Sequence, residues 1–132
     1  MIWIACVEDR MGMSFNGRRV SRDSEITRDI LAMCQEKPLY MEESSRRLFE
    51  KWEPENLVFT ETFMDLVGQY CFIENPDKAE ETEVEEVVLY RFNRHYPADR
   101  HFSLELENWM LVCREEFPGS SHDNITKEIY RR

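Results

Sequence analysis

The sequence predicts a three-layer α/β/α domain whose mainly parallel, mixed sheet ends in an antiparallel C-terminal hairpin. Short apolar runs typical of strands alternate with segments of helical spacing through the first two thirds of the chain, which favours parallel β-α-β units with right-handed crossovers. The last third has the pattern of two long strands joined by a Pro-Gly-Ser-Ser turn. At 132 residues the chain is large enough for one hydrophobic core and too short for two, so residues 1–132 are expected to form a single domain.

The first strand and the first helix set the centre of the predicted fold. Ile2–Val7 is a continuous apolar run with β-branched and aromatic members, which is typical of a strand buried on both faces in the middle of a sheet. Residues 8–22 lack periodicity and contain two glycines, so they are expected to form a long loop of the kind that often carries function. Residues 23–35 have apolar side chains at helical spacing, which predicts a helix capped by Ser21 or Ser24.

Short elements are expected between this helix and the C-terminal hairpin. Apolar and β-branched runs predict strands at residues 37–41, 56–60, 70–74 and 87–92, and short helices are predicted at residues 42–51 and 61–67. The acidic stretch at residues 75–86 has no apolar periodicity and is interpreted as a solvated loop rather than a metal site. Alternating side chains over residues 108–117 and 124–131 predict the two hairpin strands, which need a sheet to join.

Charge and hydropathy restrict the classes of function. The net charge is -10, and because residues 1–47 hold eight basic and eight acidic side chains, the whole negative excess falls after them. Such a surface repels the phosphate backbone, so no nucleic-acid partner is expected. The longest apolar runs are far too short to cross a bilayer, and the N-terminus lacks the charged region and cleavage site of a signal peptide, so we expect a cytoplasmic protein with no membrane partner.

No spacing of cysteines or histidines indicates a metal or an activated nucleophile. The four cysteines lie far apart without a C-x-x-C pair, which favours reduced core thiols over a disulfide or a zinc site. The three histidines show neither H-x-H nor H-E-x-x-H spacing, so no metal is expected. Catalysis by a serine or cysteine paired with histidine stays open, but no G-x-S-x-G turn is present and Gly119–His122 is interpreted as plain turn chemistry.

Short sequence motifs occur along nearly the whole chain, and their order is the basis of a resemblance to a known family. They are D-R-x-G-M at Asp9–Met13, K-P-L-Y-M at Lys37–Met41, N-L-V-F-T at Asn56–Thr60, D-R-H-F at Asp99–Phe102, and Trp109, Glu115–Phe117 and Ser121–His122 in the terminal region. In these strings and in the order of its predicted elements, the chain resembles the dihydrofolate reductase family. The resemblance implies that family's fold, with Asp9–Met13 where the family has its mobile active-site loop.

The position of the family's catalytic acid does not match. In the reductases, one carboxylate early in the first helix binds the pterin ring and assists proton delivery. The resemblance places Ile26 at this position, and Glu25 lies one residue away, turned by about 100° around the helix. Glu25 is therefore the candidate acid of a reductase only if the helix start is shifted.

The family's cofactor motifs do not match either. Glu42–Ser45 stands where the family has G-R-x-[ST], so a carboxylate replaces the guanidinium that pairs with the adenosine phosphate of NADPH. Glu74–Pro76 replaces the Gly-Gly pair that lets the backbone approach a second phosphate. Pro54 or Glu55 replaces the arginine that holds the folate tail. Together these differences imply a scaffold without the reductase's cofactor.

Three arginines form the one local basic cluster of the sequence. Arg18, Arg19 and Arg22 lie just before the first helix, where guanidiniums beside exposed backbone N–H groups could hold a phosphate or carboxylate. The alternative is a solvated loop whose arginines pair with neighbouring carboxylates. Tyr90 lies in the strand that lines the reductase cleft, and its hydroxyl either contacts a ligand or is satisfied inside the core.

Two functions follow from these residues. The first is a binding module for a small molecule or a protein, with no cofactor and no NADPH-dependent reductase activity. A small anionic ligand would then occupy the cleft between residues 8–22, the first helix and residues 87–92. The second is a divergent folate or pterin reductase that uses Glu25 as its acid and holds NADPH with the three arginines. A hydrolase that uses histidine is opposed by the net charge and by the missing metal spacing.

Overall fold

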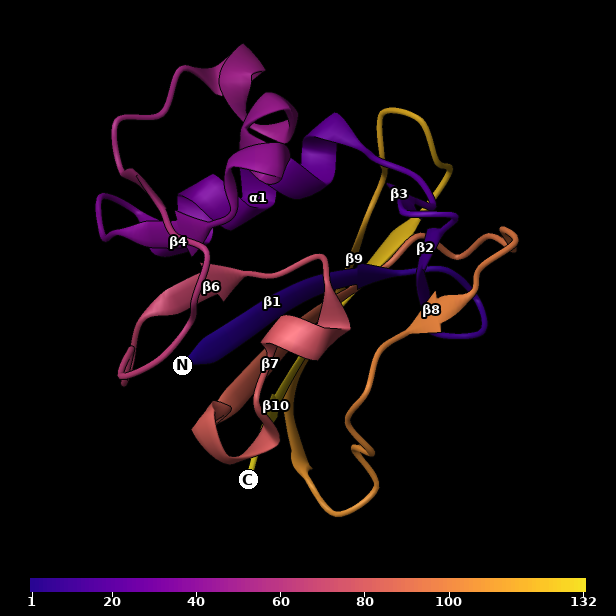
Figure 1. Ribbon diagram of the computed structural model, residues 1–132. Coiled ribbons are helices and arrows are strands. Elements are labelled where there is room, and N and C mark those ends of the chain that lie inside the picture. Colours follow the sequence, from indigo (N-terminus) through magenta and orange to yellow (C-terminus); the bar gives the residue numbers. More distant parts are fainter.

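The computed structural model describes all 132 residues and contains a sheet of seven strands in the order β5-β4-β6-β1-β7-β10-β9 (Figure 1). The strands are β1 (Ile2–Val7), β4 (Leu39–Met41), β5 (Leu57–Phe59), β6 (Tyr70–Phe72), β7 (Glu86–Arg91), β9 (Met110–Phe117) and β10 (Ile125–Arg131). The five strands from β5 across to β7 are mutually parallel, whereas β10 runs antiparallel to both of its neighbours. The predicted mainly parallel sheet with an antiparallel C-terminal hairpin is therefore confirmed.

β1 lies in the middle of this sheet, between β6 and β7. Alternate residues of a strand face opposite sides of its sheet, so an unbroken apolar run needs cover on both faces. Trp3, Ala5 and Val7 belong to the core on one face and Ile4 to the core on the other, and none of the four is more than 1% exposed. The prediction of a central strand buried on both faces is confirmed.

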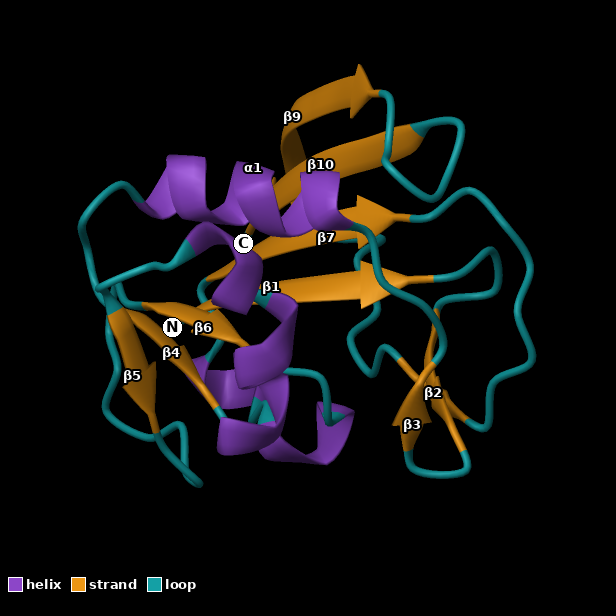
Figure 2. Ribbon diagram, turned by 90° about the horizontal axis from the view of Figure 1, so that it is seen from above, coloured by secondary structure: helices purple, strands orange, loops and turns teal.

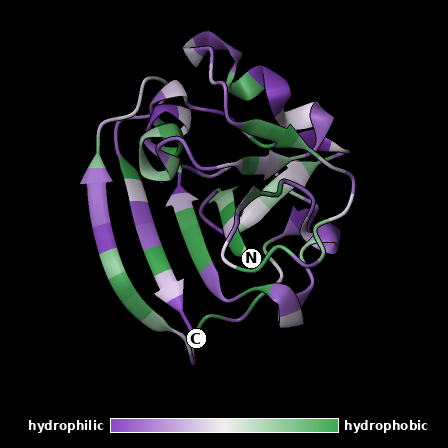
Figure 3. Ribbon diagram, turned by 90° about the vertical axis from the view of Figure 1, so that its left-hand side faces the viewer, coloured by the Kyte–Doolittle hydropathy of each residue, from purple (hydrophilic) through white to green (hydrophobic).

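β9 forms one edge of the sheet as the outer strand of the predicted hairpin. Figure 3 shows that β9 is apolar in its first half and hydrophilic in its second half. Met110, Leu111 and Val112 are all exposed, because no element covers either side of this edge. The inner strand β10 is buried along its first four residues, so the hairpin joins the core through β10.

α1 (Ser24–Cys34) covers one face of the sheet, where it lies along β7 and β10 (Figure 2). Ile26, Ile30 and Cys34 form its buried stripe and pack into the core on this side. Their spacing of four residues places them on one side of a helix, so the predicted helix is confirmed.

The N-cap of α1 is Asp23, whose carboxylate accepts the N–H of Glu25 at 3.0 Å. The prediction of Ser21 or Ser24 as the cap is therefore wrong. The reason lies far along the chain, because Asp23 also accepts the N–H of Ser120 in the turn of the C-terminal hairpin. A carboxylate can receive several N–H groups at once, whereas a hydroxyl cannot match that capacity.

Two short 3-10 helices, η1 (Glu43–Leu48) and η2 (Glu50–Trp52), replace the single helix predicted at residues 42–51 (Figure 1). Phe49, between them, is fully buried and packs edge-on against Phe72 of β6, with ring centroids 5.3 Å apart. This aromatic contact fixes the segment on the same face of the sheet as α1. None of the helices in the structure is long and apolar enough to cross a membrane.

Residues 61–67 form no helix, so the helix predicted there is wrong. The hydroxyl of Thr60 donates to the carbonyl of Thr62 and accepts its N–H, which starts the segment with a local turn. Met64 is 63% exposed and Val67 is 75% exposed. A helix this short needs docking of an apolar face to be stable, and these side chains do not dock.

The opposite face of the sheet carries no α-helix, so the predicted third layer of helices is wrong. Loops and two 3-10 turns, η3 (Pro76–Lys78) and η4 (Glu81–Glu83), cover it instead. They insert single apolar anchors, which are Phe63, Ala79, Val84, Phe102 and Leu104. The Phe102 ring stacks on Trp3 with centroids 4.4 Å apart. The acidic stretch at residues 75–86 is thus only partly solvated, because two of its residues reach the core.

The segment predicted as one long loop, residues 8–22, contains two strands. β2 (Gly12–Phe15) pairs with β3 (Arg18–Arg19) and with β8 (Arg100–His101) in a separate three-stranded sheet. The turn between β2 and β3 is Asn16–Gly17, and both residues have positive φ, 53° and 78°. An Asn-Gly pair is a strong sequence signal for a tight hairpin, so this turn could have been predicted from the sequence. The loop prediction is therefore wrong in its centre.

Candidate functional site

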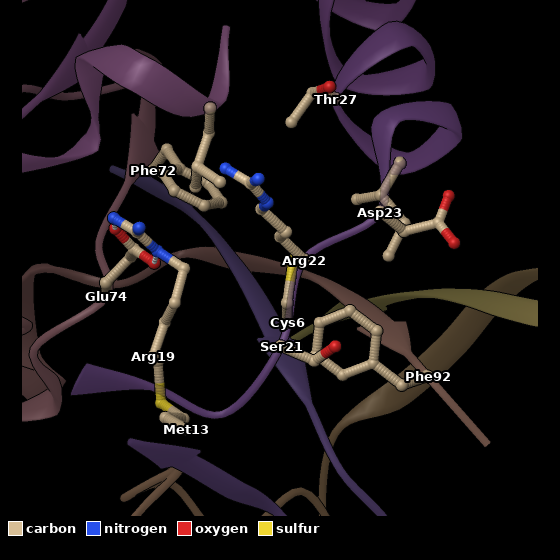
Figure 4. Close-up of a pocket in the computed structure, with 12 residues that line it drawn as sticks. Cys6, Met13, Arg19, Ser21, Arg22, Asp23, Thr27, Phe72, Glu74 and Phe92 are labelled. Atoms are coloured by element: carbon tan, nitrogen blue, oxygen red, sulfur yellow. Dashed lines mark hydrogen bonds and ion pairs between the residues drawn. The ribbon is translucent and has the colours of Figure 1, made fainter. Parts of the chain in front are cut away.

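Two adjoining cavities open where β1, β6 and β7 end, at the carboxyl edge of the parallel strands. Figure 4 shows the residues that line the inner one. The inner pit has about 20 Å³ of free volume, which is room for about one water. Cys6, Phe72 and Phe92 line it from the strand ends, and Ile26 and Thr27 line it from α1. The outer groove is larger, at about 970 Å³, and lies between the β2–β3 hairpin, the start of η1, the turn after β6 and β8. Ligands of open α/β sheets usually bind at this edge.

The groove brings together all three arginines that the sequence singled out. Arg18, Arg19 and Arg22 line it from β3 and the segment that leads to α1. Arg100 joins them, because β8 pairs with β2 and places this residue opposite Ser14. Sequence reasoning missed Arg100, since no local pattern indicates that β8 returns to the hairpin from the far end of the chain.

Arg19 is held by Glu74 in a two-pronged ion pair, with Nε and Nη2 donating to the carboxylate at 2.7 and 2.9 Å. Ser45 of η1 donates its hydroxyl to the same carboxylate at 2.7 Å, and Arg19 also donates to the carbonyl of Ser44 at 3.0 Å. The hydrogen bond to Glu74 raises the pKa of Arg19. Figure 4 shows this pair closing one side of the cavity. Arg19 is therefore neutralised within the chain.

Arg18 and Arg22 make no ion pair and no side-chain hydrogen bond within the chain, and both are exposed. Arg22 lines the pit as well as the groove, and Figure 4 shows its side chain between Phe72 and Asp23. Arg100 differs from them, because it donates to the Asp77 carboxylate. Two of the four guanidiniums therefore remain free for an anion.

The other carboxylates of the groove are already engaged. Glu42 pairs with Lys78 at 3.0 Å. Asp99 accepts the backbone N–H of Asn16 at 3.0 Å, which ties the β2–β3 turn to the segment before β8. Neither carboxylate pairs with a groove arginine, so neither satisfies Arg18 or Arg22.

Tyr90 lies away from the arginines and lines neither cavity. Its side chain is fully buried in the core beneath α1. Its hydroxyl donates to Asp29 at 2.6 Å, and Lys127 approaches the same carboxylate at 2.8 Å. Burial and the Asp29 charge raise the pKa of Tyr90 well above its ordinary value. The structure thus separates Tyr90 from the candidate ligand site and gives its hydroxyl a partner.

Glu25 also lies outside the two cavities. Its carboxylate pairs with Arg28 on the same helix at 3.4 Å. Ile26, which the resemblance places at the position of the acid, lines the pit instead. The helix start is not shifted in the way that a catalytic role for Glu25 requires.

Cys6 is the one thiol in the pit. Burial, reinforced by the Glu74 charge, raises its pKa far above the ordinary value. Only a thiolate is an effective nucleophile, so Cys6 is an apolar wall of the pit at neutral pH.

A buried cluster beside the pit was not predicted from the sequence. In this cluster, the Asp23 carboxylate lies 2.9 Å from His122 Nδ1. The Asp23 carboxylate also accepts N–H groups from Glu25, Ser120 and Ser121. Burial alone would raise the pKa of Asp23, but these hydrogen bonds lower it to about 2. The pair lies 99 residues apart in the chain, so local spacing carries no signal for it.

His122 continues this cluster toward the cavities through Nε2. Tyr96 places its hydroxyl 2.8 Å from Nε2, and the Ser21 hydroxyl lies 3.3 Å from the same atom. The imidazole stacks on Phe92 with centroids 4.8 Å apart. The turn predicted at Gly119–His122 is present, but its histidine is buried and links the hairpin to α1.

The fold and the site together define an α/β protein with an arginine-bearing groove at the carboxyl edge of its sheet. No protein-family model matches the chain, and no curated protein matches it either. No three side chains among His, Cys, Asp and Glu gather as a group that could hold a metal ion. The groove with its free guanidiniums and the buried Asp23–His122 cluster lie together at this edge of the sheet.

Proposed function

We propose that this chain is a divergent domain of the dihydrofolate reductase type that lacks NADPH-dependent reduction and binds a small anionic molecule in its groove. The order of elements supports the proposal. A central buried strand precedes a hairpin-bearing loop and the first helix, the K-P-L-Y-M and N-L-V-F-T strands are parallel neighbours, and a long antiparallel hairpin ends the sheet.

The observation that carries the proposal is the position of Glu74. It stands where the resemblance expects a glycine pair beside a cofactor phosphate, and its carboxylate already holds Arg19 and Ser45. A phosphate at this position would meet the Glu74 carboxylate, and the Arg19 guanidinium that could pair with the phosphate is already engaged by that carboxylate. The chain therefore supplies its own anion where the cofactor would bring one.

The free guanidiniums indicate the chemistry of the ligand. Arg18 and Arg22 border a groove whose volume of about 970 Å³ suits a small molecule. Guanidiniums bind carboxylate and phosphate groups with paired, charge-assisted hydrogen bonds. The remaining surface is strongly acidic, so this basic groove is where an anion is attracted.

Isothermal titration calorimetry tests the proposal with two probes, NADPH and inorganic phosphate. We expect no heat of binding for NADPH up to about millimolar concentration, and saturable binding of phosphate that is roughly tenfold weaker in Arg22→Gln, for the loss of one charged hydrogen bond. Arg28→Gln is the matched control, because Arg28 lies on α1 outside the groove. Saturable micromolar binding of NADPH would contradict the proposal and favour the divergent reductase.

A further inference from the structure

Asp23, His122 and Ser21 form a continuous hydrogen-bonded series that ends at the wall of both cavities. The Asp23 carboxylate meets His122 Nδ1 at 2.9 Å, and His122 Nε2 lies 3.3 Å from Ser21 Oγ. The side chains of Asp23 and His122 are 0% and 2% exposed, whereas Ser21 lines the pit and the groove. Only the last member of the series is therefore open to a ligand.

The buried part of the series fixes the chemistry of the imidazole. Asp23 can only accept at Nδ1, so this nitrogen carries a proton, and in the neutral imidazole Nε2 then keeps its lone pair. N–H groups from Ser120 and Ser121 hold the carboxylate, and the ring of Phe92 holds the imidazole plane. The base is thus oriented by groups that do not move with a ligand.

Two backbone N–H groups at the nucleophile, those of Ser21 and Arg22, have no acceptor within the chain. The Arg22 guanidinium has no acidic partner either and lines the same pit. Free donors next to a nucleophile are what the negative charge of a tetrahedral intermediate requires.

We propose that Ser21, His122 and Asp23 form a serine acyl-transfer site for small carboxylic esters that carry an anionic group. Ser21 Oγ attacks the ester carbonyl and its proton passes to His122 Nε2. The ester bond then breaks, and His122 gives the proton to the leaving alkoxide. Water, deprotonated by the same nitrogen, releases the acyl group as a carboxylate and restores Ser21. Asp23 is a positioning residue, because it acts through His122.

Tyr96 competes with Ser21 for the base. Its hydroxyl is closer to Nε2, at 2.8 Å, and it also accepts a hydrogen bond from Ser21 at 3.2 Å. While Tyr96 donates to Nε2, the lone pair is occupied and Ser21 is not activated. Tyr96→Phe removes this competitor and leaves Ser21 as the one hydroxyl beside the base.

The preference for an anionic group rests on the proposed function, since it uses Arg22, but the nucleophile does not. An uncharged alkyl fluorophosphonate therefore tests the nucleophile alone. Attack by Ser21 forms an O–P bond, expels fluoride and transfers the proton to His122. Intact mass and peptide mapping then identify the modified residue, and failure of anion binding would leave this result unchanged.

We expect a single adduct on Ser21 in the wild-type protein, formed at least about 100-fold more slowly in His122→Gln and faster in Tyr96→Phe. Ser103→Ala, which removes an exposed serine that lines neither cavity, is the matched control and should label like the wild type. Folding of each variant is checked by circular dichroism. If a variant does not fold, labelling of the wild-type protein alone decides the proposal. No adduct in wild type and Tyr96→Phe, an adduct on another residue, or an unchanged rate in His122→Gln would overturn the proposal.

The role of Asp23 has a spectroscopic signature of its own. In the wild-type protein, the ¹⁵N shifts of neutral His122 should show the proton on Nδ1 and an unprotonated Nε2. Asp23→Asn should mix the two tautomers and slow labelling of Ser21, because an amide can donate to Nδ1 as well as accept from it. An unchanged tautomer with unchanged labelling would remove Asp23 from the site.

Discussion

The Asp23 carboxylate makes folding stability depend on pH in a way that a single substitution can isolate. Asp23→Asn removes the charge but keeps a residue that is equally good at a helix N-cap, so the capping bond to Glu25 survives. What is lost is the attraction between a buried carboxylate and the N–H groups of Ser120, Ser121 and His122. The variant therefore keeps the cap and removes the charge together with the second acceptor oxygen, which holds Ser121 and His122.

The magnitude follows from the pKa of Asp23, which falls from its ordinary value of 3.8 to about 2 on folding. A shift of this size corresponds to about 2 kcal/mol of stability. Because the folded pKa lies below the unfolded one, this contribution is fully present above about pH 4 and is lost as the pH falls through the folded value. The difference between wild type and variant should shrink over that window.

Urea unfolding followed by circular dichroism at several pH values between about 7 and 2 measures this difference. Wild type should exceed Asp23→Asn by about 2 kcal/mol near neutral pH and by much less near pH 2. Asp123→Asn is the control, since Asp123 is an exposed residue of the same turn. A gap between wild type and Asp23→Asn that stays constant down to pH 2 would refute the reasoning.

Three further substitutions test other parts of the structure. Glu74→Gln should free Arg19 and tighten phosphate binding by roughly tenfold in calorimetry, because a like charge leaves the groove; weaker binding would contradict this. Gly17→Ala should cost about 1 kcal/mol in urea unfolding, since Gly17 has a φ of 78° and nothing within 4 Å of a new Cβ; an unchanged midpoint would contradict the turn. Phe102→Ala should cost about 3 to 5 kcal/mol, because its ring stacks on Trp3 in the core; a loss below about 1 kcal/mol would show that this irregular layer is not a true core.

The sheet could be predicted from the sequence because its strands carry their own burial pattern. Ile2–Val7 has no polar residue, and such a run is stable only between two covered faces. A Pro-Gly-Ser-Ser turn joins the strands Met110–Phe117 and Ile125–Arg131, and a hairpin of this length is stable only when it pairs with a sheet. In both cases the strands can be predicted from the local sequence alone, without knowledge of residues far along the chain.

The cover of the second face could not be predicted, because it has no period. Ala79 and Val84 are single apolar residues within an acidic stretch, and Phe102 follows a strand of only two residues. Each fills one position of the core without a helical or strand-like pattern around it. Local periodicity therefore predicted the sheet and α1 but not the layer that covers the second face.

The charged clusters could not be predicted either, because their members come from distant parts of the chain and meet only in the folded protein. The sequence indicated that Arg19 belongs to a basic cluster, but Glu74, which neutralises it, is 55 residues away. Glu74 holds Arg19 and accepts the Ser45 hydroxyl, so Arg19 and the start of η1 are fixed by contacts within the chain. In the proposed function, this carboxylate takes the place of a cofactor phosphate. The same ion pair stabilises the edge of the groove, where Arg18 and Arg22 remain free.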